Sequence, residues 1–248
     1  SQAFTGSGYV QQITSGEVQD FVRRYRGGST LPVEVATHMR FNPNLEASWF
    51  GALVEIINSV TMVSIVLTGA ALIREREHGT VEHLLVMPVT PLQIMVAKIW
   101  SMGLVVLASA VFSLIFVVRG ALHVPIQGSI LLFVAGAALN LFATTSLAIF
   151  MATLARNMPQ FGMMMMLVLL PMEILSGSIT PRESMPQVVQ DIMFFAPTTQ
   201  FVEIGQAILY RGAGIDVLWK PFLALLVIGS ALFALSLRRF RRTITQMA

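Results

Sequence analysis

Residues 74–98 read REREHGTVEHLLVMPVTPLQIMVAK and form the densest group of charged side chains between two long apolar runs. Thr80 is a suitable N-cap for a short helix at 80–88, and Glu82 lies in its first turn, where a carboxylate interacts favourably with the helix dipole. Apolar residues occupy one face of this helix, and Pro88 ends it. We therefore expect a short amphipathic helix that lies outside the membrane.

A second helix is predicted to begin directly after this segment. Thr90 and Gln93 have the spacing of a capping box, with Pro91 at the first helical position. A short amphipathic helix fixed between two membrane spans is well placed to be pushed by a partner protein, so we interpret 80–88 as a coupling helix. The alternative is an interfacial helix that only rests on lipid headgroups.

The composition is that of an integral membrane protein. The chain has 248 residues, of which 55% are hydrophobic and only 12% are charged, with a formal net charge of +3. Soluble domains carry about 25% charged residues, so a soluble globular fold is excluded. The sequence contains no cysteine, which excludes disulfides and thiolate metal sites.

Five apolar runs predict five transmembrane helices in an all-α polytopic domain at 49–248. Each run is close to the length that crosses about 30 Å of hydrocarbon. Trp49, Trp100 and Trp219 lie near the starts of three of these runs, as expected at membrane interfaces. The predicted spans cover 52–73, 94–118, 129–154, 160–176 and 219–237.

The basic residues predict the orientation of these spans, because the side richer in arginine and lysine is cytoplasmic. This places the coupling segment and the C-terminus inside, and residues 1–48 outside. The richer side contains Arg74, Arg76, Lys98, Arg156, Arg238, Arg239, Arg241 and Arg242, and the other contains Arg119, Arg182, Arg211 and Lys220.

Residues 1–48 are polar and are interpreted as the end of an extracytoplasmic α+β domain. An amphipathic helix is predicted at 17–26 and a half-buried strand at 31–41. One helix and one strand cannot bury a core of their own. Since Ser1 is not an initiator methionine, we expect this chain to be the later part of a longer polypeptide.

Residues 177–218 are predicted to form a re-entrant helical hairpin. Two short apolar-faced helices are divided by Pro197, and neither is long enough to span the membrane. Ile192 and Phe195 are too apolar for an aqueous loop, so we expect the hairpin to enter the outer leaflet and gate the pathway. Glu173 is expected beside it, available to the hydroxyl groups of Ser176, Ser178 and Thr180.

Polar residues inside the predicted spans are the other candidates for the pathway. They are Glu55, Asn58, Asn140 and Glu173. Charges at membrane depth are costly and usually face a protein interior or water. The alternative is that both glutamates lie shallow enough to reach outer headgroups or loop amides.

Small and polar residues recur at every fourth position of the third predicted span. Such a face allows close contact between helices. Its members are Gly136, Asn140, Thr144, Ala148 and Ala152.

Catalytic motifs are absent from this sequence. It contains no Gly-Lys pair, so a Walker A phosphate loop is excluded. His78 and His83 do not have the spacing of a zinc-protease motif, and no serine–histidine–acid arrangement can be argued. We therefore expect no catalytic residue, no metal and no cofactor on this chain.

The order of these parts resembles that of the ABC-2 type permeases, and the resemblance covers essentially the whole chain. Members of that family begin with a cytoplasmic N-terminus, a first span and a larger outer domain, which this chain lacks. The similar stretches are 39–44, 73–87, 99–106, 180–186 and 206–214.

The resemblance implies a drug-exporter or efflux permease in the bacterial inner membrane. Two permease chains, identical or paralogous, would form the path, and two ATPase subunits would bind ATP and magnesium beneath them. A periplasmic membrane-fusion protein and an outer-membrane channel are further implied partners, and nucleic acid is not. By position, the ATPase-facing segment 74–90 would contribute Arg74, Glu75, Arg76, Glu77, His78, Gly79, Thr80 and Glu82.

Two other functions remain open from the residues alone. One is a secondary transporter driven by an ion gradient, in which Glu55 and Glu173 would be the proton sites. The other is a non-transporting membrane enzyme or assembly factor, which the lack of a convergent nucleophile or acid pair disfavours.

Overall fold

The computed structural model describes Glu17 and residues 47–78, 89–124 and 126–247. The chain divides into two compact units, Ser1–Gly51 and Ala52–Ala248, and the packing below is that of the second. Of the predicted elements, the strand at 31–41, the helix at 17–26 apart from Glu17, and the coupling helix at 80–88 lie outside the described residues.

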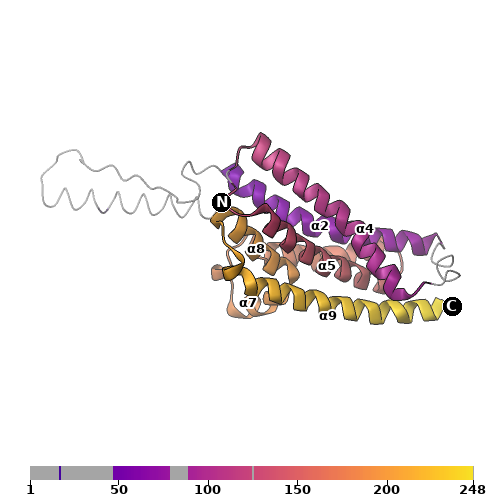
Figure 1. The fold of residues 1–248 in the computed structure, drawn as a ribbon. Helices are drawn as coiled ribbons and strands as arrows, with labels where there is room; N and C mark the ends of the chain where they lie inside the picture. Colours follow the sequence, from indigo (N-terminus) through magenta and orange to yellow (C-terminus); the bar gives the residue numbers. More distant parts are fainter. Residues whose placement is uncertain (1–16, 18–46, 79–88, 125, 248) are drawn as a thin grey trace, which may run out of the picture. The chain divides into compact units, whose positions relative to one another are not determined.

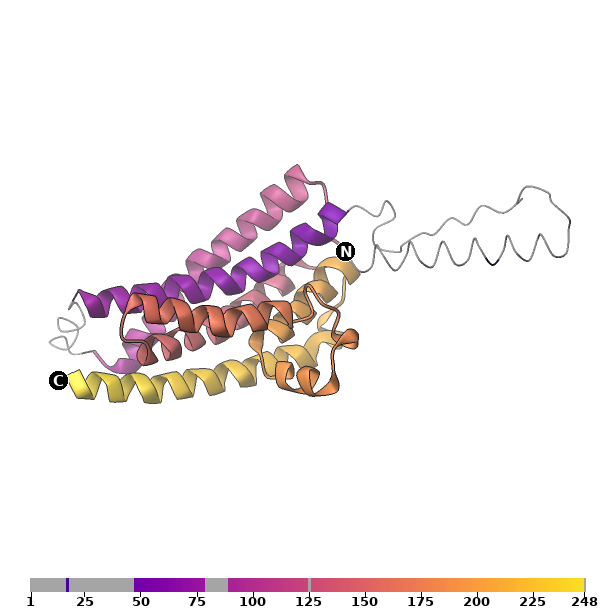
Figure 2. The same ribbon diagram turned by 180° about the vertical axis from the view of Figure 1, so that it is seen from behind.

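All regular elements among the described residues are helices, as the sequence predicts (Figure 1). The long helices run side by side along the second unit, with α7 and α8 at one end of it (Figures 1 and 2). The elements are α2 (Ala47–Glu77), α4 (Pro91–Phe112), the π-helix η1 (Ser113–Ala121), α5 (Ile130–Leu154), α6 (Met158–Ile174), the 3-10 turn η2 (Arg182–Ser184), α7 (Gln187–Phe194), α8 (Pro197–Arg211) and α9 (Ile215–Met247).

Four of the described helical segments are long and apolar enough to cross a membrane. They are Gly51–Glu77, Pro91–Ala121, Ile130–Leu154 and Ile215–Arg242, which correspond to four of the five predicted spans. The fourth predicted span, 160–176, corresponds to α6, which has 17 residues. At 1.5 Å per residue α6 is about 26 Å long, so a fifth crossing stays a prediction.

The last helix is much longer than the apolar run that predicted it. The run at 219–237 lies inside α9, which begins at Ile215 and ends at Met247. The apolar run stops at Arg238, but arginine is a good helix former and the backbone continues as a helix. The hydropathy pattern therefore predicted the apolar part of α9 and did not predict that the helix continues through the polar residues after it.

Helix α5 lies at the centre of the packing, and its small-residue face is buried along its whole length. Gly136 contacts α8, where an added Cβ atom would lie 2.8 Å from the Cγ2 atom of Ile204. The Thr144 hydroxyl lies 2.7 Å from that of Ser64 on α2. The face that the sequence predicts for close helix contact is thus occupied within this chain.

Aromatic side chains of α5 contact α8 and α9. Phe133 of α5 lies beside Phe201 of α8, with ring centroids 5.8 Å apart. The rings of Phe142 and Phe233 join α5 to α9 at 5.4 Å. Both contacts join two phenylalanine rings, and they hold the helices together by close apolar packing.

Helices α2 and α6 cross at a glycine. Phe161 of α6 is only 1% exposed, and a Cβ atom on Gly69 of α2 would overlap its ring. Gly162 is the next residue of α6, and an added Cβ atom there would meet nothing within 4 Å. Gly69 of α2 and Gly162 of α6 thus differ in whether their surroundings can accept an added methyl group.

We predict that Gly69→Ala destabilises the protein by about 1–3 kcal/mol, because the Phe161 ring must move out of a packed site. The control Gly162→Ala adds the same methyl group to open space and should leave stability unchanged or raise it by up to about 1 kcal/mol. Apparent melting temperatures in mild detergent measure both effects. Equal melting temperatures for the two variants would contradict the packing described here.

Candidate functional site

The end of α2 is held by three consecutive side chains, Glu75, Arg76 and Glu77. We call these three residues the α2 clamp. They follow the buried residue Ile73 at the point where α2 leaves the apolar core and precedes segment 79–88. Figure 2 shows this end of α2 near the turn between α5 and α6.

Arg76 joins α2 to the end of α5. Its Nη1 donates to the carbonyl oxygen of Ala152 at 3.1 Å, and its Nη2 donates to the carbonyl of Ala155. The last carbonyls of a helix have no intrahelical donor and carry the negative end of the helix dipole. The guanidinium therefore caps α5 from a neighbouring helix.

Glu77 joins α2 to the start of α6. Its Oε1 accepts a hydrogen bond from the backbone N–H of Met158 at 2.9 Å. Asn157 caps the same helix by accepting from the backbone N–H of Gln160 at 2.9 Å. A carboxylate near free N–H groups at a helix N-terminus is stabilised by both hydrogen bonding and the dipole.

Glu75 joins α2 to α4 through an ion pair with Lys98. The Lys98 side chain is 13% exposed and that of Glu75 33% exposed, so water screens this pair less than a surface pair. The predicted capping box at the start of α4 is confirmed, since Gln93 Oε1 accepts from the Thr90 N–H at 2.8 Å and Thr90 Oγ1 from the Gln93 N–H at 3.3 Å.

The residues predicted to face an ATPase thus have different environments. The three clamp residues contact other helices of this chain. Arg74 and His78 are exposed, and the His78 Nδ1 lies 2.8 Å from the carbonyl oxygen of Arg74. Gly79, Thr80 and Glu82 lie outside the described residues. An ATPase contact by any of the eight residues stays a prediction.

The sequence analysis missed the partners of the clamp. Ala152, Ala155 and Met158 contribute only backbone groups, which no side-chain pattern can indicate. Lys98 was detectable, because a lysine inside an apolar run needs a partner. Its position does not say which of the four acidic residues upstream at 55–82 would supply one.

Asn140 lies inside the interface between α2 and α5. It is fully buried, and its Nδ2 donates to the Thr61 hydroxyl at 3.0 Å. Its Oδ1 has no hydrogen-bond partner among the described residues. Asn58, one turn before Thr61 on α2, is half-buried. The bond to Thr61 shows a helix-joining role for Asn140, and its predicted place on a pathway is untested.

Glu55 and Glu173 lie within range of an electrostatic interaction with one another. Glu55 accepts a hydrogen bond from Ser59 at 3.3 Å, whereas Glu173 Oε1 is buried without a partner among the described residues.

The hydroxyls predicted near Glu173 bond to its backbone instead of its side chain. The Oγ atoms of Ser176 and Ser178 donate to the Glu173 carbonyl at 2.8 and 3.2 Å. That carbonyl has no intrahelical donor because α6 ends at Ile174. The prediction placed the right residues together and assigned the wrong acceptor atom.

The two helices of the predicted hairpin are present. Pro197 begins α8, and Gly212 ends it with a φ of 64°, which favours glycine. Helix α8 is largely buried against α5 and α9, whereas Ile192 of α7 is 66% exposed and Phe195, just after α7, is 70% exposed. Entry of this region into a membrane and its action as a gate stay predictions.

Comparison with known proteins matches residues 4–210 to the family model of the ABC-2 type transporters. The inner membrane transport permease YhhJ of Escherichia coli K12 is 63% identical over 248 residues, which cover 100% of this chain and 66% of the relative. The E. coli K12 proteins named as probable multidrug ABC transporter permeases are more distant.

YbhR is 27% identical over 247 residues, which cover 96% of this chain and 65% of the relative. YbhS is 27% identical over 213 residues, which cover 83% and 54%. The chain therefore spans about two thirds of the length of the first of these relatives and less of the others. A family match over most of the chain, on helices of membrane-spanning length, shows that it belongs to the ABC-2 type transporter family.

Proposed function

We propose that this chain is the permease part of an ATP-driven exporter in the bacterial inner membrane, with a drug-like or efflux substrate. The family match and the names of the relatives support this proposal. In it, ATP and magnesium bind a partner ATPase, and this chain contributes the path and its connection to that partner.

The α2 clamp is the observation that carries the mechanism. Segment 79–88 is bounded by α2 on one side and by α4 on the other. Glu75 ties these helices together, while Arg76 and Glu77 tie α2 to α5 and α6. A force applied by an ATPase to segment 79–88 would therefore act on four helices together.

The proposal includes a second permease chain, either identical or paralogous. The small-residue face of α5 is already used within this chain, so the partner would dock on exposed apolar surface. Met62 and Val63 of α2 are 47% and 45% exposed and lie on such a surface. A periplasmic membrane-fusion protein and an outer-membrane channel would complete the export route.

One observation favours a second candidate, an ion-gradient-driven transporter. The Glu173 carboxyl group has a buried oxygen without a hydrogen-bond partner among the described residues, and in such a transporter it would be the proton site. A non-transporting assembly factor has no comparable support in the described residues.

The full-length permease, captured from bacterial membranes in mild detergent, should copurify with an ATPase subunit. In lipid nanodiscs the complex should hydrolyse ATP. Vanadate should stop this hydrolysis and also the ATP-driven uptake of fluorescent dyes into inside-out vesicles. A protonophore should leave ATP-driven export intact. Export that resists vanadate and stops with the protonophore would replace this proposal by the ion-gradient candidate.

Charge reversal in the clamp should uncouple the permease from its partner. Glu75→Lys places two cations together, because Lys98 is the partner of Glu75. It should lower ATP-driven export about tenfold, since the loss of one charge-assisted hydrogen bond changes an equilibrium constant by about that factor. The exchange Glu75→Lys with Lys98→Glu should recover most of the activity. Arg156→Glu, which reverses an exposed charge outside the eight predicted ATPase-facing residues, is the control. An exchanged variant as inactive as the single reversal would contradict a clamp that acts through this pair.

Glu173→Gln should change export more than membrane abundance, because its carboxylate has no packing role that glutamine cannot fill. Removing one of two repelling charges should leave the fold intact. Immunoblots of membranes measure abundance, and dye export at fixed ATP measures function. Unchanged export together with unchanged abundance would show that Glu173 is not part of the pathway.

A further inference from the structure

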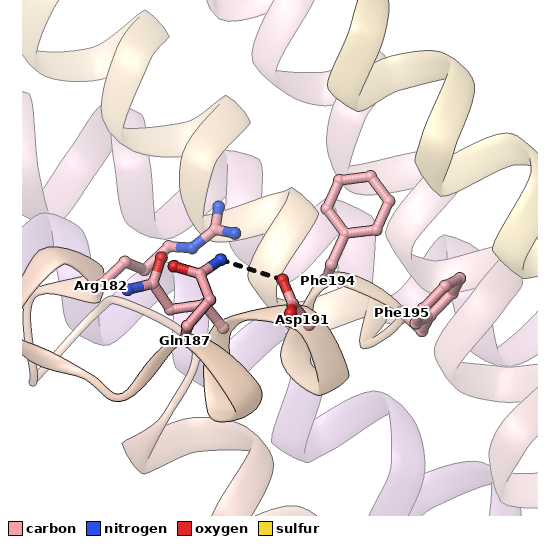
Figure 3. Close-up of a pocket in the computed structure, with 6 residues that line it drawn as sticks. Arg182, Gln187, Asp191, Phe194 and Phe195 are labelled. Carbon is pink, nitrogen blue, oxygen red and sulfur yellow. Dashed lines mark hydrogen bonds between the residues drawn. The ribbon is translucent and has the colours of Figure 1, made fainter.

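A pocket of about 300 Å³ lies beside α7 (Figure 3). This volume is at the lower end of the range for small-ligand sites. Figure 3 shows Arg182 and Gln187 on one side of Asp191, with the rings of Phe194 and Phe195 on the other. The residues that line it are Arg182, Gln187, Gln190, Asp191, Phe194 and Phe195.

Helix α7 and the residue that follows it carry apolar side chains on two faces. Met193 and Ala196 are buried with Met172 of α6 in an apolar cluster. On the outer face, Val188, Ile192 and Phe195 recur at a spacing of one and two helical turns. They are 68%, 66% and 70% exposed. We call these three residues the outer stripe.

The polar side of the pocket holds one cation and one anion. The Arg182 Nη1 donates to Glu203 at 3.2 Å, and a guanidinium has five N–H donors, so Arg182 has donors beyond the one that this bond uses. Asp191 Oδ1 accepts from Gln187 Nε2 at 3.1 Å, and a carboxylate can accept about four hydrogen bonds. The exposed Asp191 can therefore bind a second donor.

Helix α7 lies at the end of the bundle where α2 and α9 begin, away from the arginines at the end of α9 (Figure 1). By the distribution of basic residues this is the outer end. An amphipathic helix at this depth places apolar side chains among acyl chains and polar side chains among headgroups. The outer stripe and the pocket have that arrangement.

We propose that this pocket binds the headgroup of a zwitterionic phospholipid with a primary ammonium, of the phosphatidylethanolamine class. Arg182 binds the lipid phosphate, Asp191 accepts from the ammonium, and an acyl chain lies along the outer stripe. The inference uses the membrane orientation of the proposed function but needs no ATPase. The lipid would anchor α7 at the outer leaflet.

The charge pair favours this lipid over an anionic one. A phosphatidylglycerol headgroup offers the same phosphate to Arg182 but has no cation for Asp191, whose charge then repels it. A purely apolar partner surface would use the stripe but would offer no further hydrogen-bond partner to Arg182 or Asp191. A zwitterionic lipid offers a phosphate to Arg182 and an ammonium to Asp191, so it can bind both charged groups of the pocket.

Native mass spectrometry of the detergent-purified full-length permease tests the site, with phosphatidylethanolamine and phosphatidylglycerol titrated separately. Arg182→Gln should weaken binding of both lipids about tenfold. Asp191→Asn should weaken only phosphatidylethanolamine, and binding of phosphatidylglycerol should stay equal or rise. Arg211→Gln and Asp216→Asn, which change exposed charges elsewhere at the outer end, are the matched controls.

Glu203→Gln separates lipid binding from a structural role of Arg182. It removes the ion pair with Glu203 but keeps the guanidinium, so lipid binding should persist. If Glu203→Gln weakens lipid binding as much as Arg182→Gln does, then Arg182 acts through its ion pair on the fold and does not bind the lipid, and the proposal is wrong. Equal effects of Asp191→Asn on both lipids, or none on either, would overturn the proposal. None of these measurements involves ATP. The lipid site can therefore be absent from an ATP-driven exporter, and it can be present if the exporter proposal is wrong.

Discussion

The hydrogen bonds between α2 and α5 in the apolar part of the bundle fix the positions of the other helices. The Asn140 amide reaches Thr61, and the hydroxyls of Ser64 and Thr144 lie 2.7 Å apart. Polar groups at this depth find no water, so each pair is strongly preferred to separated partners. Small side chains on α5 let the two backbones approach closely enough for these bonds. Helices α4, α8 and α9 also contact α5.

The clamp at the end of α2 follows from that pairing. Because α2 lies along α5, its last turn reaches the end of α5, where the Ala152 and Ala155 carbonyls have no helical donor. Arg76 satisfies them, and Glu77 on the next position does the same for the first N–H of α6. One helix end thus supplies a cation to a helix C-terminus and an anion to a helix N-terminus, each where the dipole favours it.

Local signals in the sequence predicted local structure well, and long-range pairing poorly. The Thr90–Gln93 capping box and the break at Pro197 depend on neighbouring residues alone, and both were predicted. The hydrogen-bond partners of Arg76 and Glu173 depend on which backbone groups the fold leaves free, and no residue pattern records that. The small-residue face of α5 was recognised, but its periodicity could not say that its partners lie in the same chain.

Helix α6 connects the two ends of the described unit. At its start Met158 donates to Glu77 of the clamp, and near its end the Met172 carbonyl accepts from the Thr198 hydroxyl of α8 at 3.3 Å. Met172 also packs in the apolar cluster that holds α7. A displacement of α2 at the clamp therefore has a continuous route of packed side chains to α7 and α8. Since helices are stiff along their axes and the core is close-packed, such a displacement moves α6 as a body, and α7 and α8 must follow it or break these contacts.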